Sequence, residues 1–131
     1  MPEIFRHRGG TLSLSRTHIM GILNVTPDSF SDGGAYFRPQ DAVERALQIE
    51  AEGASILDIG AQSTRPGHAP VSADEEWARL QPVLQAVRPR VKLPISLDTY
   101  SPVVALRALK MNAADILNDV YLAARARVRM T

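Results

Sequence analysis

Strand-like and helix-like segments alternate along this chain, and the alternation repeats at a fixed distance. The stretches GASILDI at residues 53–59 and AADILND at residues 113–119 share one order of small, apolar and polar residues, and they begin 60 positions apart. That distance corresponds to two strand–helix units of about 30 residues each. Strict alternation of this kind favours a parallel sheet, either doubly wound or closed into a (β/α)₈ barrel.

The apolar patterns predict where each element lies. A hairpin over residues 4–15 is expected to turn at Gly9 and Gly10, because glycine reaches positive φ at little cost. Ser72 and Glu75 have the spacing of a capping box, and Ser101 with Pro102 has the pattern of a helix start. Strands are expected at residues 18–25, 55–60, 93–97 and 115–120, and helices at about 40–52, 72–89 and 101–111. The run at 18–25 is apolar without alternation, which predicts that both of its faces are buried.

The length limits how much of a barrel these elements can form. A complete (β/α)₈ barrel takes about 250 residues, and 131 residues leave room for about four strand–helix units. We therefore expect an α/β fold at residues 1–120, in which a short β-hairpin is followed either by a doubly wound sheet or by half of a (β/α)₈ barrel. Residues 121–131 show neither strand alternation nor a capped helix, so they are expected to form an unstructured tail.

Composition excludes several classes of function. The formal net charge of +1 gives no reason to expect nucleic acid or a membrane surface as a partner. No apolar run approaches the roughly 20 residues that span a bilayer, and no apolar segment follows the charged N-terminus as in a signal peptide. The chain has no cysteine, which excludes disulfides and thiolate metal sites. We therefore expect a cytoplasmic protein.

Each predicted strand of the sheet ends in amide or carboxylate side chains. Asn24, Asp58, Asp98 and Asn118 stand at or near the carboxyl ends of the four strands. Ligands of parallel α/β folds bind at this edge of the sheet. A shared polar site is one interpretation of this pattern, and turn formers or helix caps are the other.

Two long segments follow the first two of these strands, at residues 24–34 and 61–72. Strand-to-helix connections usually take about 2–6 residues, and longer ones are commonly lids or binding loops, or else disordered. Ser63, Thr64 and Arg65 supply two hydroxyls and a guanidinium, a set that can bind phosphate. Asn24 and Asp28 supply oxygen ligands suited to Mg²⁺, which binds few protein groups beside phosphates.

Three stretches closely resemble the dihydropteroate synthases of the folate pathway: GILNVTPDSFSDGG at 21–34, DIGAQSTRPG at 58–67 and SLDTYSPVVALRALKMNAADILNDV at 96–120. The likeness covers residues 11–120, and the first two stretches are specific to that family. It implies the N-terminal half of a (β/α)₈ TIM-type barrel. It also implies a transferase that condenses 4-aminobenzoate with 6-hydroxymethyl-7,8-dihydropterin diphosphate, with Mg²⁺, to give 7,8-dihydropteroate and pyrophosphate. Full-length members are usually homodimers.

The resemblance also implies roles for individual residues. The catalytic candidates are Asn24, which matches the asparagine that contacts metal and diphosphate, with Asp98 and Arg65. Asp98 and Asn118 match pterin-contacting residues, and Thr64 matches a diphosphate contact beside Ser63 and Arg65. Asp28 and Ser29 lie in the loop that helps to form the aminobenzoate pocket. Gln62 stands where many members have glutamate, which removes a charge but keeps the hydrogen-bonding reach.

The family's second half is not represented in these residues. Its DPGFGFGK-like, SRK-like and RVHD-like segments, which supply further pterin and diphosphate contacts, have no counterpart here. We expect no turnover by these residues alone, and poor stability or self-association because an open half-barrel exposes apolar surface. The alternatives are a non-catalytic remnant of the enzyme and the pterin-binding domain of a methyltransferase. The intact NVTPDSFSDGG loop argues against the methyltransferase.

Overall fold

The computed structural model describes residues 3–25, 38–61 and 71–118 of the chain. Its elements in chain order are β1 (Ile4–His7), β2 (Gly10–Ser13), β3 (Met20–Asn24), α1 (Pro39–Ala51), β4 (Ile56–Gly60), α2 (Ala73–Val87), β5 (Ile95–Asp98), α3 (Pro102–Lys110) and β6 (Ile116–Asn118). The predicted alternation is confirmed, and these boundaries lie within two residues of the predicted ones. The tail expected at 121–131 lies outside the described residues. None of the described helices has the length and apolar composition to cross a membrane.

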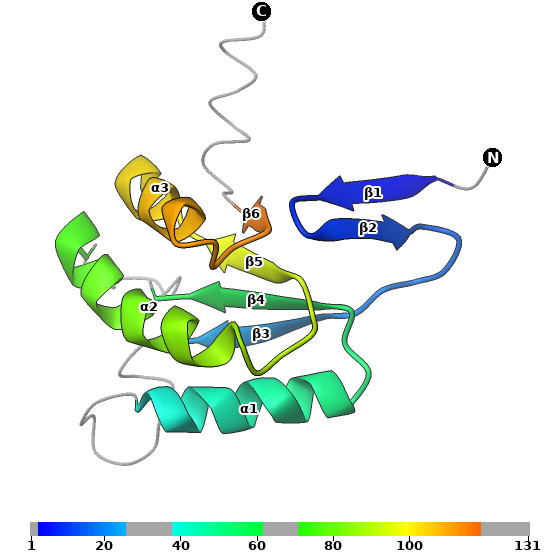
Figure 1. Cartoon of the computed structure of the whole chain (residues 1–131), viewed down its shortest axis with the longest axis horizontal. Coiled ribbons are helices and arrows are strands. Elements are labelled where there is room, and N and C mark those ends of the chain that lie inside the picture. Colours follow the sequence, from blue (N-terminus) through cyan, green and yellow to red (C-terminus); the bar gives the residue numbers. More distant parts are fainter. Residues whose placement is uncertain (1–2, 26–37, 62–70, 119–131) are drawn as a thin grey trace, which may run out of the picture.

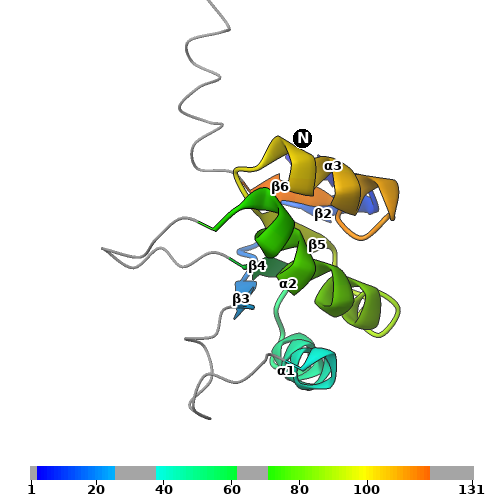
Figure 2. The same cartoon turned by 90° about the vertical axis from the view of Figure 1, so that its left-hand side faces the viewer.

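Strands β3, β4, β5 and β6 form a parallel sheet in chain order, and α1, α2 and α3 lie along one face of it (Figure 1, Figure 2). Connections between parallel strands are almost always right-handed, so consecutive strands added in one direction place all their helices on the same face. Neighbouring helices pack against each other, α1 on α2 and α2 on α3. This arrangement is the expected half of a (β/α)₈ barrel.

The hydrophobic core lies between the helices and the sheet. From the strands it contains Leu23, Leu57, Ile59, Ile95 and Leu97, and from the helices it contains Ala42, Val43, Ala46, Leu80, Val83, Leu84, Val87, Val104 and Ala108. The opposite face of β3 is not buried, since Met20 is 44% and Ile22 is 59% exposed. The prediction that both faces of this strand are buried is therefore wrong. The reason is that helices cover one face of the sheet only, so the other is open at the β3 edge.

Both predicted helix starts have the expected caps. Ser72 Oγ accepts a hydrogen bond from the Glu75 amide at 3.2 Å, and Ser101 Oγ accepts one from the Val104 amide at 3.3 Å. Pro102 occupies the first position of α3, where its missing amide hydrogen costs nothing. These local signals fix where α2 and α3 begin, and therefore how far β4 and β5 run before each connection.

The hairpin of β1 and β2 packs against the N-terminal end of the sheet. Its strands are antiparallel, with the turn at Arg8 and Gly9, one residue earlier than predicted, because Gly10 pairs with His7 as the first residue of β2. The Arg8 amide donates to the carbonyl of Asp115 at 3.2 Å, and Arg8 Nη1 donates to the carbonyl of Leu109 at 2.7 Å. A Cβ atom on Gly9 would lie 2.9 Å from Asp115 Oδ1, so glycine permits this close approach. The hairpin thus covers the end of the sheet opposite the predicted ligand edge.

A buried ion pair joins the end of α2 to the start of β6. Arg88 Nη1 and Nη2 donate to Oδ2 and Oδ1 of Asp115 at 2.5 and 2.8 Å, and the Ile95 amide donates to Oδ2 at 2.9 Å. The Asp115 side chain is 3% exposed and that of Arg88 is 28% exposed. Hydrogen bonding from Arg88 is the main reason that the pKa of the Asp115 carboxyl lies below its ordinary value, and it outweighs the opposing effect of burial.

Candidate functional site

The carboxyl ends of the four parallel strands bring three of the four predicted polar residues into one row, in which Gly60 rather than Asp58 represents β4. Asn24 pairs with Gly60, Gly60 with Asp98, and Asp98 with Asn118 across β3, β4, β5 and β6. Paired residues of adjacent parallel strands point to the same face of a sheet. Asn24, Asp98 and Asn118 therefore share the face that the helices leave open. This row is the candidate site.

Gly60 makes room for the Asp98 side chain in this row. A Cβ atom on Gly60 would lie 3.0 Å from the Cβ of Asp98 and 3.2 Å from its Oδ2. The Asp98 carboxylate therefore lies close against the backbone of β4, a position that any larger residue at 60 would disturb. The next residue, Thr99, is buried and accepts a hydrogen bond from the Ser101 amide at 3.1 Å, which ties the end of β5 to the cap of α3.

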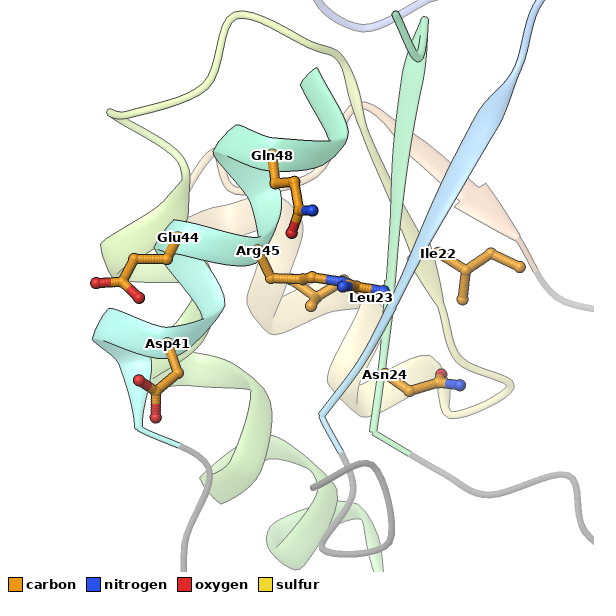
Figure 3. A pocket seen from close by; sticks show the side chains of 7 residues that line it. All are labelled: Ile22, Leu23, Asn24, Asp41, Glu44, Arg45 and Gln48. Carbon is orange, nitrogen blue, oxygen red and sulfur yellow. The ribbon is translucent and has the colours of Figure 1, made fainter. Parts of the chain in front are cut away.

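Asn24 stands at the edge of the sheet beside a cavity of about 500 Å³. Ile22, Leu23 and Asn24 of β3 and residues 41, 44, 45 and 48 of α1 line it. Figure 3 shows Asn24 and Ile22 pointing away from α1, whereas Arg45 reaches from α1 toward the strand. No hydrogen bond within the described part of the chain holds the Asn24 side chain. Its amide oxygen is thus available at the open face.

A second row of the open face contains a residue to which the motifs assign no role. Asp58 of β4 pairs with Ile22 on β3 and with Ser96 on β5. Each of these residues stands two positions before the first-row residue of its strand, so they form the next row toward the amino ends of the strands. It is 3% exposed, and its Oδ1 accepts a hydrogen bond from Nδ2 of Asn118 at 3.3 Å. This bond passes over β5, which lies between β4 and β6, and joins Asp58 to a residue of the first row.

The remaining predicted site residues lie outside the described residues: Asp28, Ser29, Ser63, Thr64 and Arg65. The structure does show where their segments begin. The Val25 amide donates to the carbonyl of Gly60 at 2.7 Å, so β3 and β4 end side by side. Arg79 of α2 donates to the carbonyl of Ala61 at 3.3 Å and holds the first residue after β4. Both segments therefore leave the sheet at the edge that carries Asn24 and Asp98.

The described rim offers an oxygen donor of the kind that Mg²⁺ takes from proteins. Residues 3–25, 38–61 and 71–118 contain no group of three or more His, Asp or Glu side chains that could hold a metal ion. Mg²⁺ usually keeps several waters and takes one or two protein oxygens with substrate phosphates. The exposed amide oxygen of Asn24 suits such a site, whereas zinc would need three or four protein ligands.

The fold is that of a family of pterin-binding enzymes. The sequence profile described as pterin binding enzyme matches residues 20–130, and the chain belongs to that family. The match continues past Val120, where the likeness in the motifs ends.

The relatives of this chain include dihydropteroate synthases. The dihydropteroate synthase of Escherichia coli K12 is 49% identical over 113 residues, which are 86% of this chain and 40% of that enzyme. The structure of Xanthomonas albilineans dihydropteroate synthase with 4-aminobenzoic acid has 46% identity and a TM-score of 0.75, over 84% of this chain and 40% of that chain. The enzyme of Clostridium difficile, in the presence of pteroic acid, has 48% identity and a TM-score of 0.76, over 82% and 40%. The chain thus spans about 40% of the length of these relatives.

Proposed function

We propose that these residues form the part of a dihydropteroate synthase that binds the pterin and its diphosphate. The observation that carries the proposal is the row in which Asn24, Asp98 and Asn118 share one face at the carboxyl ends of β3, β5 and β6. Identity of 49% to the Escherichia coli enzyme supports the same assignment.

The proposed reaction joins the amine of 4-aminobenzoate to the exocyclic methylene carbon of the pterin diphosphate. The C–N bond forms as the C–O bond to the diphosphate breaks, the nitrogen loses a proton, and pyrophosphate leaves. Asp98 and Asn118 hold the pterin ring, and Ser63, Thr64 and Arg65 contact the diphosphate. Asp28 and Ser29 help to form the place of the aminobenzoate. Asn24 would hold Mg²⁺, which would supply positive charge to neutralise the leaving diphosphate.

These residues alone are proposed to bind the pterin without turning it over. The chain spans about 40% of the relatives, and the family segments that supply further pterin and diphosphate contacts are not among its residues. A non-catalytic remnant has the same binding residues, so assays must separate it from a part of an active enzyme. We further propose small-molecule ligands rather than nucleic acid or a membrane, a cytoplasmic location, and a homodimer for the full-length enzyme.

Binding and turnover should be measured separately. Quenching of the intrinsic fluorescence of 6-hydroxymethylpterin reports binding, and incorporation of labelled 4-aminobenzoate reports turnover. We expect weak binding by the wild-type chain, loss of binding in Asp98→Ala, and unchanged binding in Asp74→Ala, whose carboxylate is exposed on α2. A chain that binds neither the pterin nor its diphosphate refutes the proposed function. Turnover by these residues alone refutes the expected incompleteness and the remnant alternative together.

A further inference from the structure

A carboxylate is buried in the middle of the open sheet face, and no ion pair within residues 3–25, 38–61 and 71–118 includes it. Asp58 is 3% exposed, and the Arg88–Asp115 and Arg107–Asp74 pairs of the described residues do not include it. Within these residues, its side chain has one hydrogen bond, from Asn118 Nδ2 to Oδ1 at 3.3 Å. Burying a carboxylate costs several kcal/mol, and a well-packed apolar residue often gives equal or greater stability. Stability alone therefore does not account for Asp58.

The hydrogen bond has a direction that matters for Asn118. A carboxylate is an acceptor only, so the Asn118 atom that faces Asp58 is the amide nitrogen. The amide is planar, so this contact turns Oδ1 away from Asp58. At 3.3 Å the bond is at the long end of the usual range. It therefore contributes little energy but selects one of the two orientations of the amide.

We propose that Asp58 is a positioning residue that makes Asn118 present its carbonyl oxygen, rather than its NH₂ group, to a ligand at the rim. Asp98, the register partner of Asn118, supplies carboxylate oxygens in the same row. The two strands then offer acceptors side by side. Such a pair favours a heterocycle edge with neighbouring N–H donors and disfavours an edge of acceptors. The inference rests on the proposed function for the ligand's identity, but not for the orientation of Asn118.

The orientation can be measured without a ligand. The chain has three asparagines, Asn24, Asn112 and Asn118, so ¹⁵N-asparagine labelling gives three side-chain amide signals. We expect the two Nδ2 protons of Asn118 to be widely separated in chemical shift and slow to exchange in the wild type. In Asp58→Ala, the chemical-shift separation should decrease and the exchange rate should increase, both to the values of the exposed Asn112. Asp58→Asn, which can still offer an acceptor oxygen, should restore the wild-type values, and Asn118→Asp assigns the signal.

Ser96→Ala is the matched control, because Ser96 is buried in the same row as Asp58. It should leave the Asn118 signal unchanged, which separates orientation from general loosening of the sheet. If Asp58→Ala does not fold, the comparison of wild type with Asp58→Asn still decides. If the proposal is right, the two Nδ2 protons of Asn118 keep their wide separation in chemical shift in Asp58→Asn. An Asn118 signal that resembles Asn112 in the wild type, or one that is unchanged in a folded Asp58→Ala, overturns the inference.

Measurement of ligand binding tests whether the orientation of Asn118 matters for function. Titration with 6-hydroxymethylpterin should show Asp58→Ala binding about five- to tenfold more weakly than wild type, the ordinary loss when one hydrogen bond is no longer pre-oriented. Asp58→Asn should bind within about twofold of wild type. A wild-type chain that does not bind the pterin refutes the proposed function, and the amide signals then still decide the role of Asp58.

Discussion

The Arg88–Asp115 ion pair offers the sharpest test of what holds this fold together. Asp115→Ala removes the acceptor of both guanidinium hydrogen bonds and of the Ile95 amide, which lies 2.9 Å from Oδ2. Hydrogen bonds to charged groups contribute about 1.5–3 kcal/mol, and an unsatisfied buried amide costs about 1–3 kcal/mol. Arg88 is 28% exposed and can be rehydrated, which reduces the first contribution.

We expect Asp115→Ala to lower the free energy of unfolding by about 3 kcal/mol. For a chain of this size that corresponds to roughly 12 °C in Tm, at about 4 °C per kcal/mol. Urea unfolding followed by circular dichroism measures the change, at concentrations where sedimentation velocity shows one species. Arg107→Ala is the control, because its pair with Asp74 spans 3.5 Å and both side chains are exposed. That variant should change the stability by less than about 0.5 kcal/mol.

A loss below about 1 kcal/mol in Asp115→Ala refutes this reasoning, since the pair would then contribute no more than an exposed one. A loss that Arg107→Ala reproduces also refutes it, because burial would then make no difference.

Three further predictions concern pH, the rim and the open edges. The pKa of Asp115 is lower in the folded chain than in the unfolded chain. The ionised carboxylate therefore stabilises the fold fully at pH values above its pKa in the unfolded chain, and this stabilisation is lost as the pH falls through its pKa in the folded chain. The urea concentration at the midpoint of unfolding should fall as the pH is lowered below about 4, and it should fall less steeply in Asp115→Ala. An equal dependence of the midpoint on pH in both proteins contradicts this. Gly60→Ala should displace the Asp98 carboxylate and weaken pterin binding in the fluorescence assay, with a stability cost of about 1–3 kcal/mol; unchanged binding contradicts the close approach. Ile22 and Leu117, 59% and 42% exposed, should drive self-association, so Ile22→Lys with Leu117→Lys should shift sedimentation toward monomer; a cooperative wild-type monomer contradicts this.

Local patterns predicted the elements well. The caps at Ser72 and Ser101 were visible in the sequence because each depends on residues within one turn of the helix. The carboxyl-edge row was predictable for a related reason, since parallel strands of known polarity must end at one edge. Asn24, Asp98 and Asn118 therefore lie where the strand ends place them.

Non-local contacts were not predictable in this way. Arg88 and Asp115 stand 27 positions apart, and no periodicity relates the end of a helix to the start of a strand three elements later. Asp58 was visible as a polar strand residue, but its bond to Asn118 depends on which strands are neighbours and in which register. The error on β3 has a similar cause. An apolar run does not show whether a second layer covers it.

The position of Asp115 in the chain has a consequence for how β6 is aligned. Three residues of β6 pair with β5, and a strand so short holds its alignment weakly. The Asp115 amide donates to the carbonyl of Ile95 at 2.8 Å, and the Ile95 amide donates back to the Asp115 carboxylate. This two-way contact fixes the first residue of the pairing. A slip of one residue would move Asn118 to the opposite face of the sheet, so a contact at the far end of the strand determines on which side the site has its asparagine.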